Sequence, residues 1–110
     1  MFASELKKGS APFLLLALLE AGPLHGYELS RLLEHRSGGL VHFHAASLYP
    51  LLYRLESQGL VDGRWVEKPG QRRRRYYRLT AAGQRQLRAN RREWLEFVNA
   101  IGRIAGVECA

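Results

Sequence analysis

The sequence is poor in cysteine and in acidic residues. One cysteine, Cys109, stands near the C-terminus, so no disulfide can form within the chain. This excludes a small disulfide-stabilised secreted domain, and we expect a reducing cytoplasmic location. Ten Asp and Glu face seventeen Lys and Arg in 110 residues, a formal net charge of +7. A small domain with this surplus is expected to bind a polyanion, either nucleic acid or an anionic membrane surface.

No hydrophobic run is long enough to span a bilayer. The most apolar stretch, residues 12–22, is shorter than the roughly 20 residues that a transmembrane helix needs, and it predicts a buried helix instead. Glu5 and two lysines precede it and no small-residue cleavage site follows it, so we expect no signal peptide. The sequence therefore predicts no membrane partner.

Catalytic and metal-binding patterns are also missing. The chain has no nucleophile motif, no phosphate-binding glycine loop and no paired carboxylate site, so we expect that it is not an enzyme. His42 and His44 are spaced to share one face of a strand, but no cysteine or carboxylate stands at ligand spacing beside them. We therefore expect neither a metal site nor a cofactor.

The positive charge is concentrated in one segment. Residues 64–92 contain eleven basic residues and one acid, Glu67, whereas the other 81 residues contain six basic and nine acidic residues. One part of the molecule is therefore expected to carry the positive field and to form the binding face.

Hydrophobic periodicity and turn residues predict a mostly helical chain with one hairpin. Pro69-Gly70 marks a turn between two strand candidates, and Thr80 is expected to cap the last helix. The expected elements are helices over residues 4–21, 26–36, 47–58 and 81–104, an extended piece over 40–43, and strands over 60–68 and 72–80.

This order predicts a winged helix-turn-helix: mostly α, with a small β-hairpin and a C-terminal dimerisation helix. The major groove of B-DNA admits one α-helix, which the preceding helices hold, while the hairpin reaches sideways to the backbone or minor groove. We expect residues 1–80 to form the DNA-binding domain and residues 81–110 the dimerisation helix and tail, in one compact domain.

Several sequence motifs follow one another at characteristic spacing. They are Gly26-Tyr27-Glu28-Leu29, Ser47-Leu48-Tyr49-Pro50-Leu51-Leu52-Tyr53-Arg54-Leu55-Glu56, Gly59-Leu60-Val61, Arg73-Arg74-Arg75-Tyr76-Tyr77-Arg78-Leu79-Thr80 and Gly83. Through these motifs the chain resembles the PadR-like transcriptional regulators over about residues 6–87. One departure is His44-Ala45-Ala46, where such proteins usually have a glycine before the third helix. The resemblance implies a homodimer that binds a palindromic operator, usually as a repressor.

The third predicted helix is the expected recognition helix, because its leucines share one face and leave the other for DNA. Ser47 is expected to cap this helix, and it could contact a phosphate as well, since the two roles are compatible. Pro50 is expected at the third helical position, in the first turn. Tyr49 lies on the flank and could equally pack or bind phosphate. The expected contacts are Ser47, Tyr49, Pro50, Tyr53 and Arg54.

The wing is expected to bind through its arginine run, since guanidinium groups bind phosphate bidentately. A solvated charged strand is the alternative. Strand alternation sends Arg73 and Arg75 to one face, and Arg72 and Arg74 to the other, where they point most freely outward. The expected contacts are Arg72, Arg73, Arg74 and Arg75.

The last predicted helix is too long for one small core to cover, at about 36 Å. Its apolar residues recur at heptad spacing, which predicts a seam with a second copy. Trp94 is either a dimer anchor or, with Phe97, the wall of a cavity for a small aromatic or apolar effector. The expected seam residues are Leu87, Trp94, Phe97, Val98 and Ile101.

Two other functions share this fold. The chain could bind RNA or any nucleic acid without sequence preference, or it could dock another protein. The long last helix favours the sequence-specific regulator, because a two-fold dimer suits paired DNA half-sites.

Overall fold

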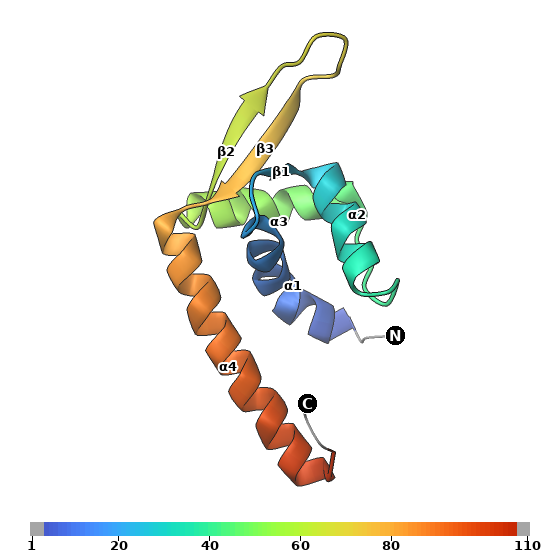
Figure 1. Ribbon diagram of the computed structural model, residues 1–110, viewed down its shortest axis with the longest axis vertical. Helices are drawn as coiled ribbons and strands as arrows, with labels where there is room; N and C mark the ends of the chain where they lie inside the picture. Colours follow the sequence, from blue (N-terminus) through green and yellow to red (C-terminus); the bar gives the residue numbers. More distant parts are fainter. Residues whose placement is uncertain (1–3, 108–110) are drawn as a thin grey trace.

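The computed structural model describes residues 4–107, and Cys109 lies outside them. A long C-terminal helix and a projecting hairpin extend from a small helical body (Figure 1). The described elements are α1 (Ser4–Leu19), β1 (Leu24–His25), α2 (Gly26–Arg36), α3 (Ala45–Ser57), β2 (Val61–Val66), β3 (Arg74–Leu79) and α4 (Ala81–Ala105).

The three strands form one antiparallel sheet in the order β1-β3-β2. In the register of the hairpin, Trp65 lies opposite Arg75 and Gly63 lies opposite Tyr77. The predicted hairpin is confirmed, although both strands are shorter than expected. β1 was missed, because two residues are too few to show the alternation that identifies a strand. No strand forms over residues 40–43, where the Ser37 side chain organises a turn.

Leucines from the first three helices fill the core beneath the sheet. Leu15, Leu16 and Leu19 of α1 are fully buried, as expected for the most apolar segment. Burial of a leucine side chain contributes about 2 kcal/mol, so each of these residues stabilises the body substantially. The other buried residues of this cluster include Leu29, Leu33, Leu48, Leu52, Leu55, Val61, Tyr77 and Leu87.

α3 begins earlier than the sequence predicts. Its N-cap residue is His44, and the backbone N–H of Ser47 already donates to the His44 carbonyl at 2.9 Å. The prediction that Ser47 caps the helix is therefore wrong. Pro50 is the sixth residue of α3 rather than the third, so it removes the N–H that would bond to the Ala46 carbonyl.

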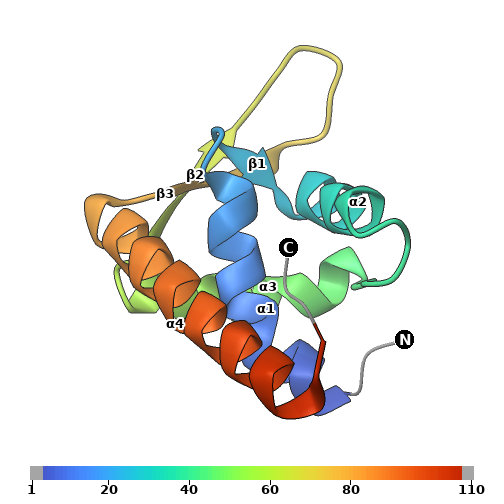
Figure 2. The same cartoon turned by 60° about the horizontal axis from the view of Figure 1, so that its bottom comes forward.

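α4 is capped as predicted and then continues along the body of the molecule. The Gly83 N–H donates to Thr80 Oγ1 at 3.0 Å, and Thr80 Oγ1 donates to the Gly59 carbonyl at 2.6 Å. Beyond this first contact the helix runs past α1 (Figures 1 and 2), where Arg91 binds both carboxylate oxygens of Glu20. None of the described helices is both long and apolar enough to cross a bilayer.

Candidate nucleic-acid interface

One face of α3 is buried and the other is exposed, as the leucine pattern predicts. Leu48, Leu52 and Leu55 point into the core. The opposite side presents hydroxyl, apolar and cationic groups to solvent, a mixture suited to base edges and phosphates. The exposed residues on this side include Ser47, Pro50, Tyr53 and Arg54.

Tyr49 is half-buried and packs on the start of α2. A Cβ atom placed on Gly26 would lie 2.9 Å from Tyr49 Cζ, so this glycine leaves room for the ring. The Tyr49 and Tyr53 ring centroids are 6.2 Å apart. These contacts favour the packing alternative for Tyr49, while its contact with DNA stays a prediction.

The four wing arginines lie in different surroundings. Arg72 and Arg73 are exposed in the turn before β3, and Arg74 is half-buried at the start of that strand. Arg75 reaches back to α3, where its Nη2 donates to Glu56 Oε2 at 2.6 Å. Only 21% of the Arg75 side chain is exposed. The prediction that Arg72 and Arg74 point most freely outward is therefore wrong for Arg74, and the exposed pair, Arg72 and Arg73, is the part of the run best placed to meet a ligand.

Trp65 is a wing residue that sequence reasoning missed as a site residue. Its ring is half exposed, with the Arg73 guanidinium 4.7 Å and the Arg75 guanidinium 5.6 Å from the ring centroid. The strand register that places Trp65 opposite Arg75 depends on the length of the turn. Pairing the two predicted strands symmetrically about Pro69-Gly70 is the sequence signal that could have placed Trp65 opposite the arginine run.

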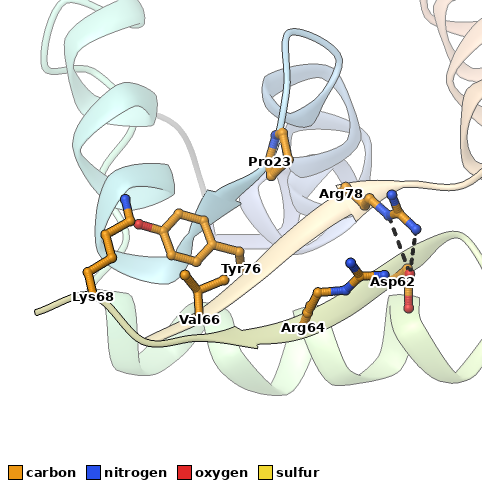
Figure 3. A pocket seen from close by; sticks show the side chains of 7 residues that line it. All are labelled: Pro23, Asp62, Arg64, Val66, Lys68, Tyr76 and Arg78. Atoms are coloured by element: carbon orange, nitrogen blue, oxygen red, sulfur yellow. Dashed lines mark hydrogen bonds and ion pairs between the residues drawn. The ribbon is translucent and has the colours of Figure 1, made fainter. Parts of the chain in front are cut away.

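A second group of cations lies on the other face of the sheet (Figure 3). Arg64, Lys68 and Arg78 surround a shallow hollow of about 220 Å³ that also includes Tyr76. Arg78 pairs with Asp62 at 3.2 Å, and the Lys68 ammonium lies 5.5 Å from the Tyr76 ring centroid. The positive field therefore extends over both faces of the hairpin.

Burial sets the protonation of two residues behind this surface. The pKa of Tyr77 is raised to about 12, mainly by burial, so its phenol stays neutral. The pKa of His25 is lowered, and burial is the largest cause. The nearby negative charge of Glu28 acts in the opposite direction and raises it. Neutral His25 caps α2, since its Nδ1 accepts from the Glu28 N–H at 3.3 Å. Both residues therefore serve the fold as uncharged groups.

The histidine pair does not assemble a metal centre. The His42 and His44 rings contact each other edge to face, and His42 Nδ1 lies 3.2 Å from Glu34 Oε2. Within residues 4–107, no group of three or more His, Cys, Asp or Glu side chains is arranged to hold a metal ion.

The predicted α4 seam divides into a buried and an exposed part. Leu87 is buried in the chain's own core, so its placement in the dimer seam is wrong. The reason is that the first two turns of α4 still cover the body. Trp94, Phe97 and Ile101 are exposed, and Val98 is half-buried. The exposed apolar stripe therefore starts about two turns later than the heptad pattern suggests.

Three helices followed by a basic hairpin, with an exposed face on the third helix, define a winged-helix protein of the DNA-binding class. A family model described as the transcriptional regulator PadR-like family matches residues 15–89. This chain belongs to the PadR-like family of transcriptional regulators, which confirms the resemblance seen in its motifs.

Solved structures agree with this assignment. The chain is similar to a transcriptional regulator from Clostridium thermocellum, with 27% identity, a TM-score of 0.84, and coverage of 94% of this chain and 97% of that one. A PadR family regulator from Eggerthella lenta is 35% identical, with a TM-score of 0.80 and coverage of 94% and 88%. Bacillus subtilis PadR in complex with operator DNA is 25% identical, with a TM-score of 0.65 and coverage of 77% and 46%. These relatives are regulators rather than enzymes.

Proposed function

We propose that this chain is a sequence-specific repressor that binds a palindromic DNA operator as a homodimer in the cytoplasm. The observation that carries the proposal is the exposed face of α3 together with the exposed Arg72 and Arg73 of the hairpin. The hairpin itself projects from the body (Figure 1). α3 enters the major groove, and the wing arginines bind phosphates or the minor groove. The proposed contacts are Ser47, Pro50, Tyr53, Arg54, Arg72, Arg73 and Arg74.

The homodimer is proposed to form through the second half of α4. An exposed apolar stripe on a helix that leaves the body needs a partner surface, and a second copy supplies the same stripe by two-fold symmetry. Two copies then present two α3 helices to two half-sites. The exposed stripe consists of Trp94, Phe97, Ile101 and Ile104, and the half-buried Val98 is proposed to lie beside it in the seam.

A small aromatic or apolar effector is proposed to bind where the two stripes meet. The Trp94 ring centroid lies 5.7 Å from that of Phe97 and 6.2 Å from that of Phe13. Aromatic side chains at these distances form a surface on which a flat molecule stacks favourably. Such a molecule would change the packing of the two copies and thereby the spacing of the two α3 helices.

The experiment is a binding titration of the chain on two DNA duplexes at several salt concentrations. One duplex comes from the region upstream of its own gene, and the other has the same composition in shuffled order. We expect binding at least about a thousandfold tighter to the first duplex. Equal affinities would support the nonspecific alternative, and binding to neither would support protein docking.

A further inference from the structure

A continuous stack of charged and aromatic groups crosses the inner face of the wing. Glu56 at the end of α3 pairs with Arg75, which lies against one side of Trp65. Arg73 lies against the indole 4.7 Å from its centroid, and its Nε is 3.6 Å from Glu67 Oε1. Two guanidinium groups thus share one indole, and each is also paired with a carboxylate.

The inner end of this stack is tied to the recognition helix. Glu56 Oε2 accepts from Arg75 Nη2 at 2.6 Å and from the backbone N–H of Gly63 at 3.2 Å, so one carboxylate on α3 holds both strands. A Cβ atom on Gly63 would lie 2.7 Å from Arg75 Nε. A side chain at this position would therefore displace the end of the Arg75 side chain from its path to Glu56.

The outer end of the stack is open to a ligand. Trp65 is 51% exposed, so it contributes little to the core, and its main neighbours include the two arginines. Stacking on an indole restricts a guanidinium to one plane while its N–H groups remain directed outward in that plane. Glu67 lies beyond hydrogen-bonding distance of Arg73, which leaves the guanidinium able to bind another anion.

We propose that Trp65 is a positioning residue that orients Arg73 toward a DNA phosphate, and that Arg75 is a strut between α3 and the wing rather than a phosphate contact. This proposal rests on the proposed DNA-binding function. The wing is then a preorganised arm, because the angle between its phosphate-binding arginine and the recognition helix is set before DNA arrives.

The first test is a double-mutant cycle on the affinity for the upstream duplex. Trp65→Leu should weaken binding about two- to fivefold, the range expected for loss of an exposed cation–π contact. Arg73→Ala should then reduce the affinity for this duplex by a smaller factor in the Trp65→Leu chain than in the original chain. The matched control Arg72→Ala should reduce the affinity by the same factor in both chains. Trp65→Phe should restore most of the affinity, because it keeps an aromatic face.

The outcomes separate this proposal from the function on which it rests. Equal costs of Arg73→Ala in both chains would overturn the positioning role of Trp65 while leaving DNA binding intact. Failure of the original chain to bind DNA would overturn both. If Trp65→Leu fails to fold, Trp65→Thr takes its place in the same cycle, because it keeps a strand-forming residue and removes the aromatic face. Equal losses of affinity on adding Arg73→Ala would again contradict the proposal.

The salt dependence of binding tests the role of Arg75. The slope of log affinity against log salt falls by about one for each phosphate contact that is lost. Arg75→Gln should therefore lower the affinity but keep the slope, while Arg73→Ala should reduce the slope by about one. A reduced slope for Arg75→Gln would show that Arg75 binds phosphate and would overturn its role as a strut.

Discussion

At the scale of single residues, the strand register places the four consecutive arginines of the wing in different surroundings. Arg75 is held by Glu56, whereas Arg72 and Arg73 remain exposed. Composition alone predicts that all four are equivalent. The distinction depends on which residue of β2 faces each arginine and on how close α3 lies to it. Both are features of the tertiary structure, which the alternation of residues along one strand cannot predict.

Arg54 is the recognition-helix residue whose replacement gives the clearest expected effect. Its side chain is exposed on α3, away from the leucine face. If it contacts a base, Arg54→Ala should weaken operator binding by about 1–3 kcal/mol and relax the preference at one operator position. Fluorescence anisotropy with a set of single-base operator variants measures both effects.

A suitable control for Arg54→Ala is Arg103→Ala, which removes the same charge near the far end of α4. The control should leave the operator preference unchanged. An equal loss of affinity by Arg54→Ala on operator and shuffled DNA would contradict a base contact and indicate a phosphate contact.

His25 should make the stability of the fold depend on pH. Because burial lowers its pKa in the folded chain, the unfolded chain takes up a proton more readily. The stability that neutral His25 contributes is present above its ordinary pKa, about 6.5, and is lost as the pH falls below that value. The nearby charges of Glu28, Arg74 and Lys68 act on the same proton.

The measurement is the midpoint of thermal unfolding at about pH 7.5 and about pH 5.5. His25→Asn keeps a residue that can cap α2 and removes the titration. The decrease on acidification should be smaller in His25→Asn than in the original chain. Equal decreases in the two chains would contradict a role for His25, since the other histidines are common to both.

At the scale of elements, the sequence predicts the order and kind of nearly every element but not all of their ends. α2 runs over the expected residues, because its apolar spacing and glycine stop are both clear. The sequence misplaces the start of α3 because Ser47 is a good capping residue. The helix instead begins at Ala45, after the N-cap residue His44, whose side chain makes no capping hydrogen bond. The Phe43 carbonyl before it is held by the Ser30 hydroxyl of α2, a long-range contact.

The wing as an element should supply a measurable share of the electrostatic binding. Arg72→Ala with Arg73→Ala removes two exposed cations and should reduce the salt slope by about two on any duplex. The fold should survive, because neither side chain is buried. An unchanged slope with the double variant would exclude the wing from the interface.

The C-terminal half of α4 should determine the oligomeric state. Ile101→Asp places a carboxylate in the exposed apolar stripe and should give a monomer with much weaker operator binding. Asn99→Asp is the control, because Asn99 is exposed on the opposite side of the same helix. Sedimentation at micromolar concentration distinguishes the two states, and a dimeric Ile101→Asp chain would contradict the proposed seam.

At the scale of the whole molecule, the two proposed functions lie at separate ends of one chain 55 Å long. The hairpin and the end of α4 point in opposite directions from the body (Figure 1). The proposed DNA contacts lie on α3 and the hairpin, and the exposed apolar residues Trp94, Phe97, Ile101 and Ile104 lie on the second half of α4. The winged-helix arrangement and the family could be predicted from motif order. The division of α4 between core and seam could not, because it depends on where the helix leaves the body.

A hydroxyl-radical footprint of the chain on its own upstream DNA tests the proposal of a dimeric, sequence-specific repressor most directly. Two α3 helices related by two-fold symmetry should protect two half-sites with inverted sequence, about one helical turn or a multiple of one turn apart. The same pattern should disappear with Ile101→Asp and persist with Asn99→Asp. A single protected patch without symmetry, or even protection along the whole fragment, would contradict the account.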